Sequence, residues 1–457
     1  RFLDGYADDE AQYRALIDNA VTLASEWNLV PGVALTAEQM AQLTSDVVWL
    51  VERSVTLANG ESRKVLVPQV YVRVRDGDLN GNGALIAGQQ LKLDLSGDLL
   101  NSGSIGGRSI VSLNARNIEN LGGRIQADRA ALIARDDLNN TGGVIGARDS
   151  LLVQAGNDVN LNAVTQDSSS VQGSRTSLSR VAGLFVSGDA GTLQVSAGND
   201  INLNAAQLLN AGRGGVTRLE AGRDLNLGTA SESHQQMVRW NDSNWRNESS
   251  HTEVGSTIQG TGNLLLSAGQ DINARGATVR SEQGMLLAEA SRDIRIEAAE
   301  QQQFVDEAHR FKGRSGMFSS KTTTLRDTVD RTQAQGSTFS ADQLYLNADR
   351  DIGVRGSDLV SSRQTQLQAG RDVDLTAASV YNQERHDQSV KKSGLFSGGG
   401  LSLTIGTQRQ SVSDRSDGQS ARASTLGSTV GNVIIEAGNS YRQSGSHVMT
   451  PTGDVNV

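Results

Sequence analysis

The stretch "LLVQAGNDVNLNAV", residues 151–164, decides how this chain folds. Apolar residues alternate with polar ones on both sides of the central Gly156-Asn157-Asp158. Alternation with a period of two is typical of a strand that buries one face. The central tripeptide predicts a sharp corner, because glycine adopts positive φ without steric cost and Asn or Asp tolerates it. The stretch therefore predicts a strand, a corner and a second strand.

The same pattern recurs along most of the chain. Clear copies are "VSAGNDINL" (195–203), "LEAGRDLNL" (219–227) and "LQAGRDVDL" (367–375). We predict that the glycine and aspartate of each copy form a structural corner: Gly156 and Asp158, Gly198 and Asp200, Gly222 and Asp224, Gly370 and Asp372. Corner geometry explains an aspartate in every copy better than catalysis does, because an active site occurs once.

A repeat of about 20 residues with two or three short strands cannot bury its apolar face alone, but it can when stacked on its neighbours. Stacked units pair through parallel ladders about 4.8 Å apart. The composition agrees with many thin layers, since only 4% of the 457 residues are aromatic. The sequence therefore predicts an all-β, right-handed parallel β-helix, because right-handed is the usual hand of parallel crossovers.

Four polar segments interrupt the repeat, near residues 166–190, 231–258, 299–338 and 380–428. Three of them carry a similar motif: "RVAGLFVSG" around Phe185, "GRSGMFSSK" around Phe318, and "KKSGLFSGGG" around Leu395 and Phe396. We interpret the segments as β-hairpin excursions from one side of the solenoid, where repeat proteins often bind partners. The apolar residues are candidate membrane or partner contacts. The alternative is that they anchor each hairpin onto the solenoid.

Two tryptophans stand out in the second excursion. Trp240 and Trp245 lie among polar residues in "RWNDSNWRNESSH" (239–251). Their rings could stack on sugar rings or contact a membrane or partner, and they could equally pin the excursion to the solenoid. We count both as candidate contact residues.

The chain begins differently from the repeats. Residues 1–53 are predicted to be helical, with Pro31-Gly32 between two amphipathic segments. Residues 54–78 are predicted to form a hairpin and strand, because Asn59-Gly60 separates two apolar runs. A solenoid needs its exposed end covered, so these residues are predicted to cap the repeats of residues 79–457. The last residues look like an interrupted repeat, so the chain is expected to be an internal segment of a longer protein.

Several function classes find no support in the composition. The net charge of −9 is spread along the chain, and no basic patch with interleaved aromatic residues argues for a nucleic-acid partner. The absence of cysteine excludes disulfides and thiolate chemistry. Four of the five histidines lie in the excursions, without a nearby cluster of metal ligands. We expect no catalytic residues, cofactor, metal or small-molecule substrate, and therefore a protein that is not an enzyme.

The motifs "GALIAG", "NLGGRI", the "AGRD" corners and "KKSGLFSGGGLSLTIG", taken together, resemble the exoproteins of contact-dependent growth inhibition. These exoproteins belong to the filamentous haemagglutinin family and are secreted by two-partner (type Vb) systems of Gram-negative bacteria. The opening "RFLDGYADDEAQYRALIDNA" resembles the end of their periplasmic Tyr/Pro-rich segment. The remainder resembles their second haemagglutinin-type repeat region.

The resemblance implies a function that composition and periodicity do not. It implies a non-enzymatic module that is held in the periplasm, exported on contact, and helps to carry a C-terminal toxin across the target cell's outer membrane. The implied partners are the outer-membrane transporter of the two-partner system, the target-cell outer membrane, and a toxin and immunity protein elsewhere in the system. The alternative is an adhesin or filament segment that binds host or bacterial surfaces.

Overall fold

The computed structural model describes residues 9–27, 29–35, 39, 47–56, 62–71, 85–316, 319–397 and 403–457. The chain divides into two compact units, which are residues 1–87 and residues 88–457. The N-terminal unit contains the helix α1 (Asp9–Trp27) and an antiparallel pair of strands, β1 (Val47–Thr56) and β2 (Ser62–Tyr71).

The prediction of helix up to residue 53 was wrong for residues 47–53, which belong to β1. Val47, Trp49 and Val51 alternate along this strand and are buried together with Ala20 and Leu23 of α1. A period of two with β-branched residues favours a strand, and pairing with β2 satisfies its backbone. The predicted turn at Asn59-Gly60 lies outside the described residues.

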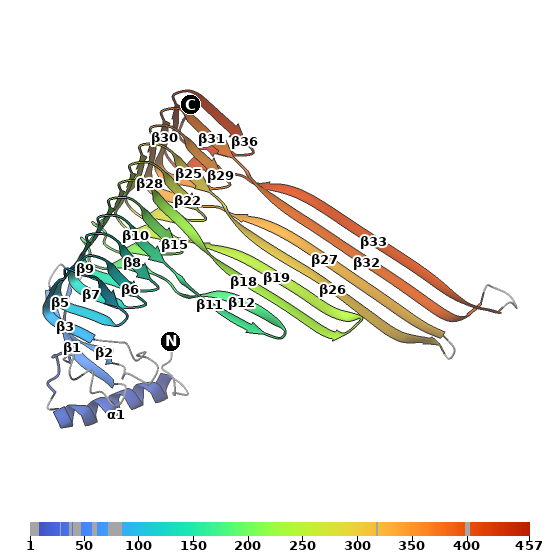
Figure 1. The fold of residues 1–457 in the computed structure, drawn as a ribbon, viewed down its shortest axis with the longest axis horizontal. Helices are drawn as coiled ribbons and strands as arrows, with labels where there is room; N and C mark the ends of the chain where they lie inside the picture. Colours follow the sequence, from blue (N-terminus) through green and yellow to red (C-terminus); the bar gives the residue numbers. More distant parts are fainter. Residues whose placement is uncertain are drawn as a thin grey trace. The chain divides into compact units, whose positions relative to one another are not determined.

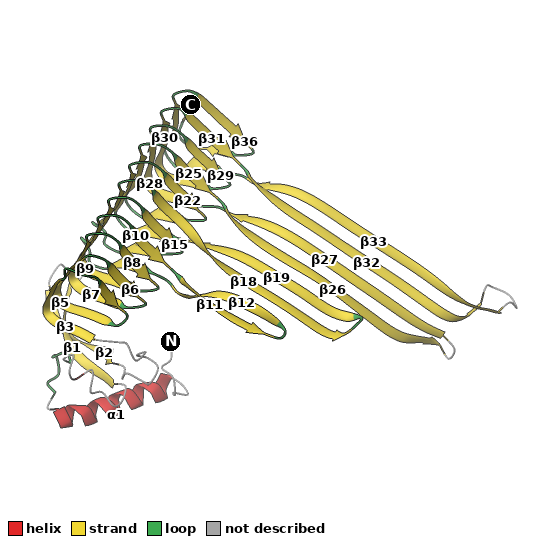
Figure 2. Ribbon diagram, viewed as in Figure 1, coloured by secondary structure: helices red, strands yellow, loops and turns green. Residues whose placement is uncertain are grey.

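The second unit is a solenoid whose coils each contribute strands to three walls (Figures 1 and 2). Short strands of successive coils pair in parallel to form the first wall. This wall consists of β4 (Leu99–Asn101), β6 (Ile118–Leu121), β8 (Leu138–Thr141), β10 (Val159–Asn162), β15 (Ile201–Asn204), the start of β18 (Leu225–Asn241), β22 (Ile272–Arg275), β25 (Ile294–Glu297), β29 (Ile352–Arg355), β31 (Asp372–Thr376) and β36 (Ser440–Ser444).

The second and third walls are also parallel, and in several coils one long strand runs through both. β9, for example, pairs with β13 over its first half and with β14 over its second half. These walls consist of β3 (Leu85–Asp94), β5 (Ser104–Ala115), β7 (Arg124–Ala134), β9 (Val144–Ala155), β13 (Gly183–Val186), β14 (Thr192–Ala197), β16 (Gln207–Asn210), β17 (Val216–Ala221), β20 (Thr257–Gly260), β21 (Asn263–Ala268), β23 (Thr278–Ser281), β24 (Met285–Ala290), β28 (Thr338–Ala348), β30 (Asp358–Ala369), β34 (Thr425–Ser428), β35 (Val433–Ala437), β37 (His447–Met449) and β38 (Val455–Asn456).

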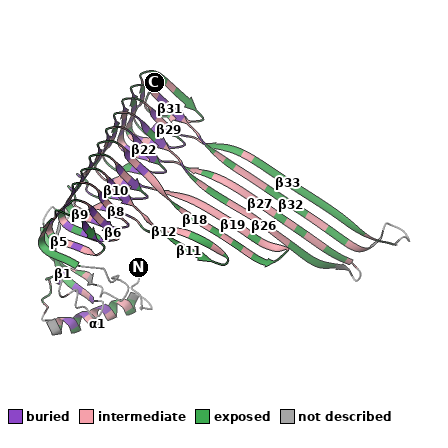
Figure 3. Cartoon of the chain, viewed as in Figure 1, coloured by how far each residue is buried: buried purple, intermediate pink, exposed green. Residues whose placement is uncertain are grey.

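The core of the solenoid is a stack of thin aliphatic layers. Leu151 and Val153 from one wall and Val159 and Leu161 from another are fully buried, and each has an equivalent in the next coil. Figure 3 shows the buried residues gathered in the solenoid strands, whereas the hairpins are exposed or half-buried. The prediction of an all-β parallel β-helix with β-hairpin excursions is confirmed.

Four β-hairpins leave the solenoid, each directly after a first-wall strand. We call them hairpin 1 (β11, Val164–Ser170; β12, Gly173–Arg180), hairpin 2 (the outer part of β18; β19, Asn244–Gly255), hairpin 3 (β26, Ala299–Gly316; β27, Ser319–Gln335) and hairpin 4 (β32, Ala378–Ser397; β33, Leu403–Arg422). Neighbouring hairpins pair antiparallel through β12–β18, β19–β26 and β27–β32. The result is one continuous sheet on one side of the solenoid, which we call the hairpin sheet (Figure 1).

From β10 onward, hairpins leave every second coil. The first-wall strands β10, β18, β25 and β31 lead into hairpins, while β15, β22, β29 and β36 lead directly into the next wall. Two coils rise by about 9.6 Å, which is also the width of two paired strands at about 4.8 Å each. Because the two widths match, hairpins from alternate coils lie edge to edge and pair without gaps in their register.

Candidate functional site

The corner glycines face the backbone of the preceding coil. A Cβ on Gly198 would lie 1.9 Å from the carbonyl oxygen of Gly156, and a Cβ on Gly222 would lie 2.0 Å from that of Gly198. Gly156 and Gly370 approach a preceding carbonyl equally closely. None of these four glycines has a positive φ, so that part of the corner prediction was wrong. Glycine fits these four corners because the preceding coil comes so close there that a Cβ would meet its backbone.

The corner aspartates form a continuous ladder along the solenoid. The side-chain oxygen of one corner residue accepts a hydrogen bond from the backbone N–H of the corner residue one coil later, at 3.0–3.3 Å. The ladder runs through Asp98, Asn117, Asp137, Asp158, Asp200, Asp224, Asp271, Asp293, Asp351 and Asp372. At each corner, this hydrogen bond pairs a backbone N–H group that the strand-to-strand hydrogen bonds leave unpaired.

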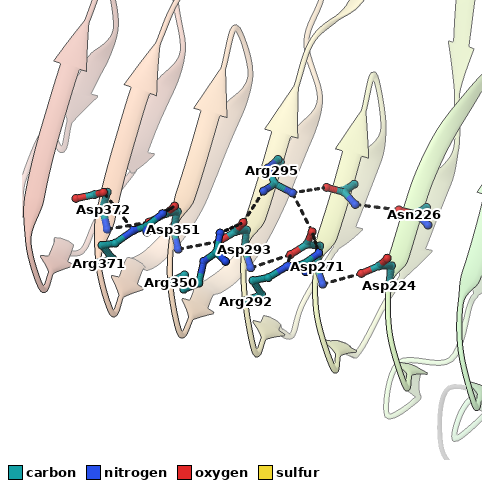
Figure 4. A network of polar contacts seen from close by, with 11 residues as sticks. Asp224, Asn226, Asp271, Arg292, Asp293, Arg295, Arg350, Asp351, Arg371 and Asp372 are labelled. Atoms are coloured by element: carbon teal, nitrogen blue, oxygen red, sulfur yellow. Dashed lines mark hydrogen bonds and ion pairs between the residues drawn. The ribbon is translucent and has the colours of Figure 1, made fainter.

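Arginines of the "RD" corners neutralise this ladder, as Figure 4 shows. Arg292 donates two hydrogen bonds to Asp271, at 2.6 and 2.5 Å, and Arg295 adds a third at 3.0 Å. The Arg292 guanidinium is the main reason that the pKa of Asp271 falls to about 2. Arg116 lowers the pKa of Asp98 to about 2 in the same way. These carboxylates are therefore held charged by structural partners and are not poised for proton transfer.

Amide side chains form a second ladder on the outer face of the first wall. Asn160 donates to Asn139 at 2.8 Å, Asn202 to Asn160 at 2.9 Å, and Asn226 to Asn202 at 2.8 Å. Asn273 extends the ladder by donating to Asn226 at 3.0 Å. Each amide inside the ladder thus donates to one neighbouring coil and accepts from the other, which ties successive coils together along the first wall.

Buried serines close the solenoid where a hairpin returns to it. The Ser256 hydroxyl oxygen lies 2.8 and 3.0 Å from the carbonyl oxygens of Leu203 and Gly228, which share its one proton, and it accepts the N–H of Ala206. Ser337 and Ser424 make the equivalent contacts at the roots of hairpins 3 and 4. The backbone groups that the departing hairpin leaves unpaired are therefore satisfied, and the hairpins can be inserted without disturbing the core.

The predicted Gly-Leu-Phe residues do not share one environment. Phe185 lies in β13, a wall strand paired with β9 and β16, and its ring packs over Gly183. The first excursion therefore ends at Arg180, earlier than the predicted residue 190, and the motif around Phe185 belongs to the solenoid. Leu395 and Phe396 lie in β32, paired with Ile405 and Thr404 of β33. The Phe318 position lies outside the described residues.

The two predicted tryptophans have different neighbours at the end of hairpin 2. Trp240 lies beside His309 of hairpin 3, with ring centroids 5.9 Å apart. Trp245 lies under the guanidinium of Arg326, which is 5.9 Å from its ring centroid. Trp240 is 60% exposed, so it remains available to a partner. Trp245 is half-buried between hairpins 2 and 3, where it supports their pairing.

Other exposed apolar residues of the hairpins escaped the sequence analysis. Val171 lies fully exposed at the turn of hairpin 1, Ile405 is 83% exposed in β33, and Met237 and Phe311 are exposed in β18 and β26. Val171 and Phe311 lie singly in polar segments, so no apolar run marks them. Met237 lies three residues before Trp240, and Ile405 lies within the "KKSGLFSGGGLSLTIG" motif, so the sequence offered a signal for both.

The described residues hold no group of three or more His, Cys, Asp or Glu side chains that could bind a metal ion. In the same residues no helix is both long and apolar enough to cross a membrane. The hollows on the surface are shallow; one at the root of hairpin 1 is lined by Thr141, Thr165 and Arg180.

Comparison with known proteins gives consistent matches. A hemagglutinin repeat model matches residues 238–324 and 318–457. The tRNA nuclease CdiA of Escherichia coli (strain STEC_O31) is 30% identical over 98% of this chain, and the deoxyribonuclease CdiA of Dickeya dadantii (strain 3937) is 32% identical over the same share. The tRNA nuclease CdiA-2 of Burkholderia pseudomallei (strain 1026b) is 27% identical. The match covers 16% of each of these relatives, so the chain spans about a sixth of their length. No solved structure matches the chain.

Proposed function

This chain belongs to the CdiA-type filamentous haemagglutinin family, and on that premise we propose that it is a non-enzymatic translocation module of a contact-dependent inhibition exoprotein. It helps to carry a C-terminal toxin across the target cell's outer membrane. The relatives indicate a secreted or cell-surface protein of a Gram-negative bacterium. Storage in the periplasm, export by the partner transporter and an immunity protein elsewhere in the system are parts of the proposal. The word "nuclease" in the relatives' names describes those full-length proteins, of which this chain spans about a sixth.

The observation that carries the proposal is the hairpin sheet. The polar groups of the solenoid corners are occupied by the ladders, whereas the hairpins present apolar side chains to solvent at their outer parts, such as Val171, Trp240 and Ile405. An exposed apolar side chain contributes binding energy when a membrane or partner covers it. We therefore propose that the outer parts of the hairpins make the contact with the target cell, and Phe318, Leu395 and Phe396 remain candidate contact residues on the strength of their sequence motif.

Phe185 and Trp245 fit the anchoring alternative better. The Phe185 ring packs on a solenoid strand, and the Trp245 ring is engaged by Arg326. Their proposed role is to hold hairpins and walls in place, so replacing them should affect stability before it affects delivery.

Removal of hairpin 4 tests the proposal. Coils without a hairpin turn directly through one residue with positive φ, which is a glycine at Gly276, Gly356 and Gly445 and an alanine at Ala205; Gly356 lies between Arg355 and Ser357 and has φ of +55°. Replacing residues 377–423 with a single glycine joins Thr376 to Ser424, which occupies the position of Ser357. We expect secretion and receptor binding of the full-length exoprotein to be retained and toxin delivery to be lost, as measured by growth of target cells in co-culture.

Normal delivery by this variant would contradict the proposal. The matched control replaces the outer strands of hairpin 4 with those of hairpin 3, residues 301–333, so that the sheet keeps its edge while its sequence changes. An adhesin is the second candidate, favoured by the exposed Trp240 and Phe311 rings. It predicts that the hairpin-4 deletion weakens attachment to cells, and that delivery falls only in proportion to attachment.

A further inference from the structure

An apolar stripe crosses one face of the hairpin sheet about halfway along hairpins 3 and 4. The stripe consists of Trp240, His309, Phe311, Leu325, Val390 and Val412. His309 pairs with Leu325, which pairs with Gln388, which pairs with Val412. Directly paired residues of antiparallel strands point to the same face, and so do residues two apart on one strand. The register therefore brings side chains of hairpins 3 and 4 together on a single face, and the contact of Trp240 with His309 adds a ring from hairpin 2.

Three rings form the centre of this stripe. The His309 and Phe311 rings are nearly parallel, with centroids 6.1 Å apart and planes inclined by 18°. The Trp240 ring also contacts His309, with centroids 5.9 Å apart. The two outer rings remain open to solvent, since Trp240 is 60% and Phe311 57% exposed. Paired hairpins thus hold two accessible rings in a fixed row.

The surroundings of the rings are polar and carry positive charge toward the ends of the hairpins and negative charge toward their roots. On the root side, Glu307, Asp327 and Asp414 lie in the next row of the same face, and Glu307 Oε2 is 3.6 Å from His309 Nε2. Phe311 pairs with Thr323, and Val390 pairs with Gln410, so a hydroxyl and an amide lie in the same row on this face. One row further out, Lys321 pairs with Lys392. Neither ammonium makes an ion pair within the described part of the chain, and both side chains are exposed.

We propose that this stripe binds an anionic oligosaccharide. The C–H face of a sugar ring carries partial positive charge and packs on the negative face of an aromatic ring, here Trp240 or Phe311. The Gln388 and Gln410 amides donate and accept hydrogen bonds as sugar hydroxyls require. Lys321 and Lys392 lie about 7 Å further along the strands, where they pair with a carboxylate or phosphate on the next sugar.

A lipid bilayer fits the stripe less well. β32 continues for seven residues beyond Val390, to Ser397, and therefore extends about 24 Å past the stripe. A membrane that meets the end of hairpin 4 does not reach Trp240. The inference is independent of the proposed delivery role.

Binding of the whole 457-residue chain to defined ligands tests the inference. The ligands are oligogalacturonate, which carries carboxylates, phosphomannan oligosaccharide, which carries phosphates, neutral dextran oligosaccharide, and phosphatidylglycerol vesicles without sugar. We expect calorimetry to show binding to at least one anionic oligosaccharide. Trp240→Ala and Phe311→Ala should each weaken it about tenfold, and the Lys321→Ala/Lys392→Ala pair should remove its dependence on salt.

Matched variants separate the stripe from general surface effects. Tyr381→Ala removes an aromatic side chain, 42% exposed, near the root of hairpin 4, and Lys391→Ala removes a lysine from the opposite face of the same strand. Both should bind like the original chain, and circular dichroism should show that every variant is folded. Failure to bind any oligosaccharide, equal binding to the vesicles, or equal losses from Lys391→Ala and Lys392→Ala would overturn the inference.

Discussion

At the scale of single residues, the solenoid depends on a close backbone contact and on polar ladders between coils. A glycine such as Gly198 lies against the carbonyl of Gly156, while the aspartate two residues later accepts the N–H of the next coil. Arg135, Ser291 and Asp349 occupy the glycine position in three other coils, as their backbone hydrogen bonds to Ala115, Ala268 and Ala290 show. A side chain is therefore tolerated only where the local stacking of the coils leaves space for it.

Gly198→Ala should destabilise the solenoid. The new Cβ would lie 1.9 Å from the carbonyl oxygen of Gly156, so two coils must move apart locally. We expect the free energy of unfolding to fall by about 1–3 kcal/mol, as for other overpacked sites. Chemical denaturation followed by circular dichroism measures this loss. Gly353→Ala is the control, because a Cβ at Gly353 has no neighbour within 4 Å. Equal stability of the two variants would show that the contact does not require glycine.

At the scale of elements, the hairpins are held to one another by side chains as well as by backbone pairing. Arg331 of β27 contacts Glu384 of β32, and His386 of β32 lies 2.8 Å from Asp327 of β27. The hydrogen bond to Asp327 is the main reason that the pKa of His386 is raised above its usual 6.5. The negative charges of Glu384 and Asp414 raise this pKa further. This pairing is strongest when His386 is protonated.

The pairing of hairpins 3 and 4 should therefore depend on pH. A group whose folded pKa is raised contributes its full stabilisation below the unfolded pKa of 6.5, and loses it as the pH rises through the folded value. NMR titration should give His386 a pKa above 6.5, and Asp327→Asn should lower it. Asp330→Asn, on the opposite face of β27, is the control and should leave the titration unchanged. An unshifted His386 pKa in the original chain would contradict the expectation.

Much of the solenoid could be predicted from the sequence, because its signals are local. The alternation around Gly156 and the recurring aspartates identify strands and corners within a few residues. The partners of the arginines and the stripe on the hairpin sheet could not be predicted, because they join residues one coil or one hairpin apart. Residues 47–53 were wrongly predicted as helix. Their apolar residues fit a helix or a strand over so short a stretch, and the pairing with β2 decides for the strand.

At the scale of the whole repeat unit, the alternation of coils carries information that the sequence analysis did not use. The separations between ladder residues are 42, 24, 47, 22, 58 and 21, and then 68 to Ser440. Every long step is one coil with a hairpin, and every short step is one coil without. The alternation keeps hairpins two coils apart, which is the spacing that lets them pair.

Removing one coil or two should therefore have different effects. Deleting residues 272–293 joins Asp271 to Ile294 and removes a coil without a hairpin, so hairpins 2 and 3 leave adjacent coils about 4.8 Å apart. Two-stranded hairpins do not fit that spacing, and the β19–β26 pairing should break. Deleting residues 225–293 joins Asp224 to Ile294 and removes two coils with hairpin 2, so hairpins 1 and 3 keep the original spacing.

Hydrogen exchange distinguishes the two deletions. In the one-coil deletion, amides of residues 245–252 should lose protection while the first-wall strands keep theirs, because the solenoid closes at an equivalent corner. In the two-coil deletion, both the solenoid and the remaining hairpins should stay protected. Retained protection of residues 245–252 after the one-coil deletion would mean that the hairpins pair at any spacing. The match between hairpin width and coil rise would then not be what holds the sheet together.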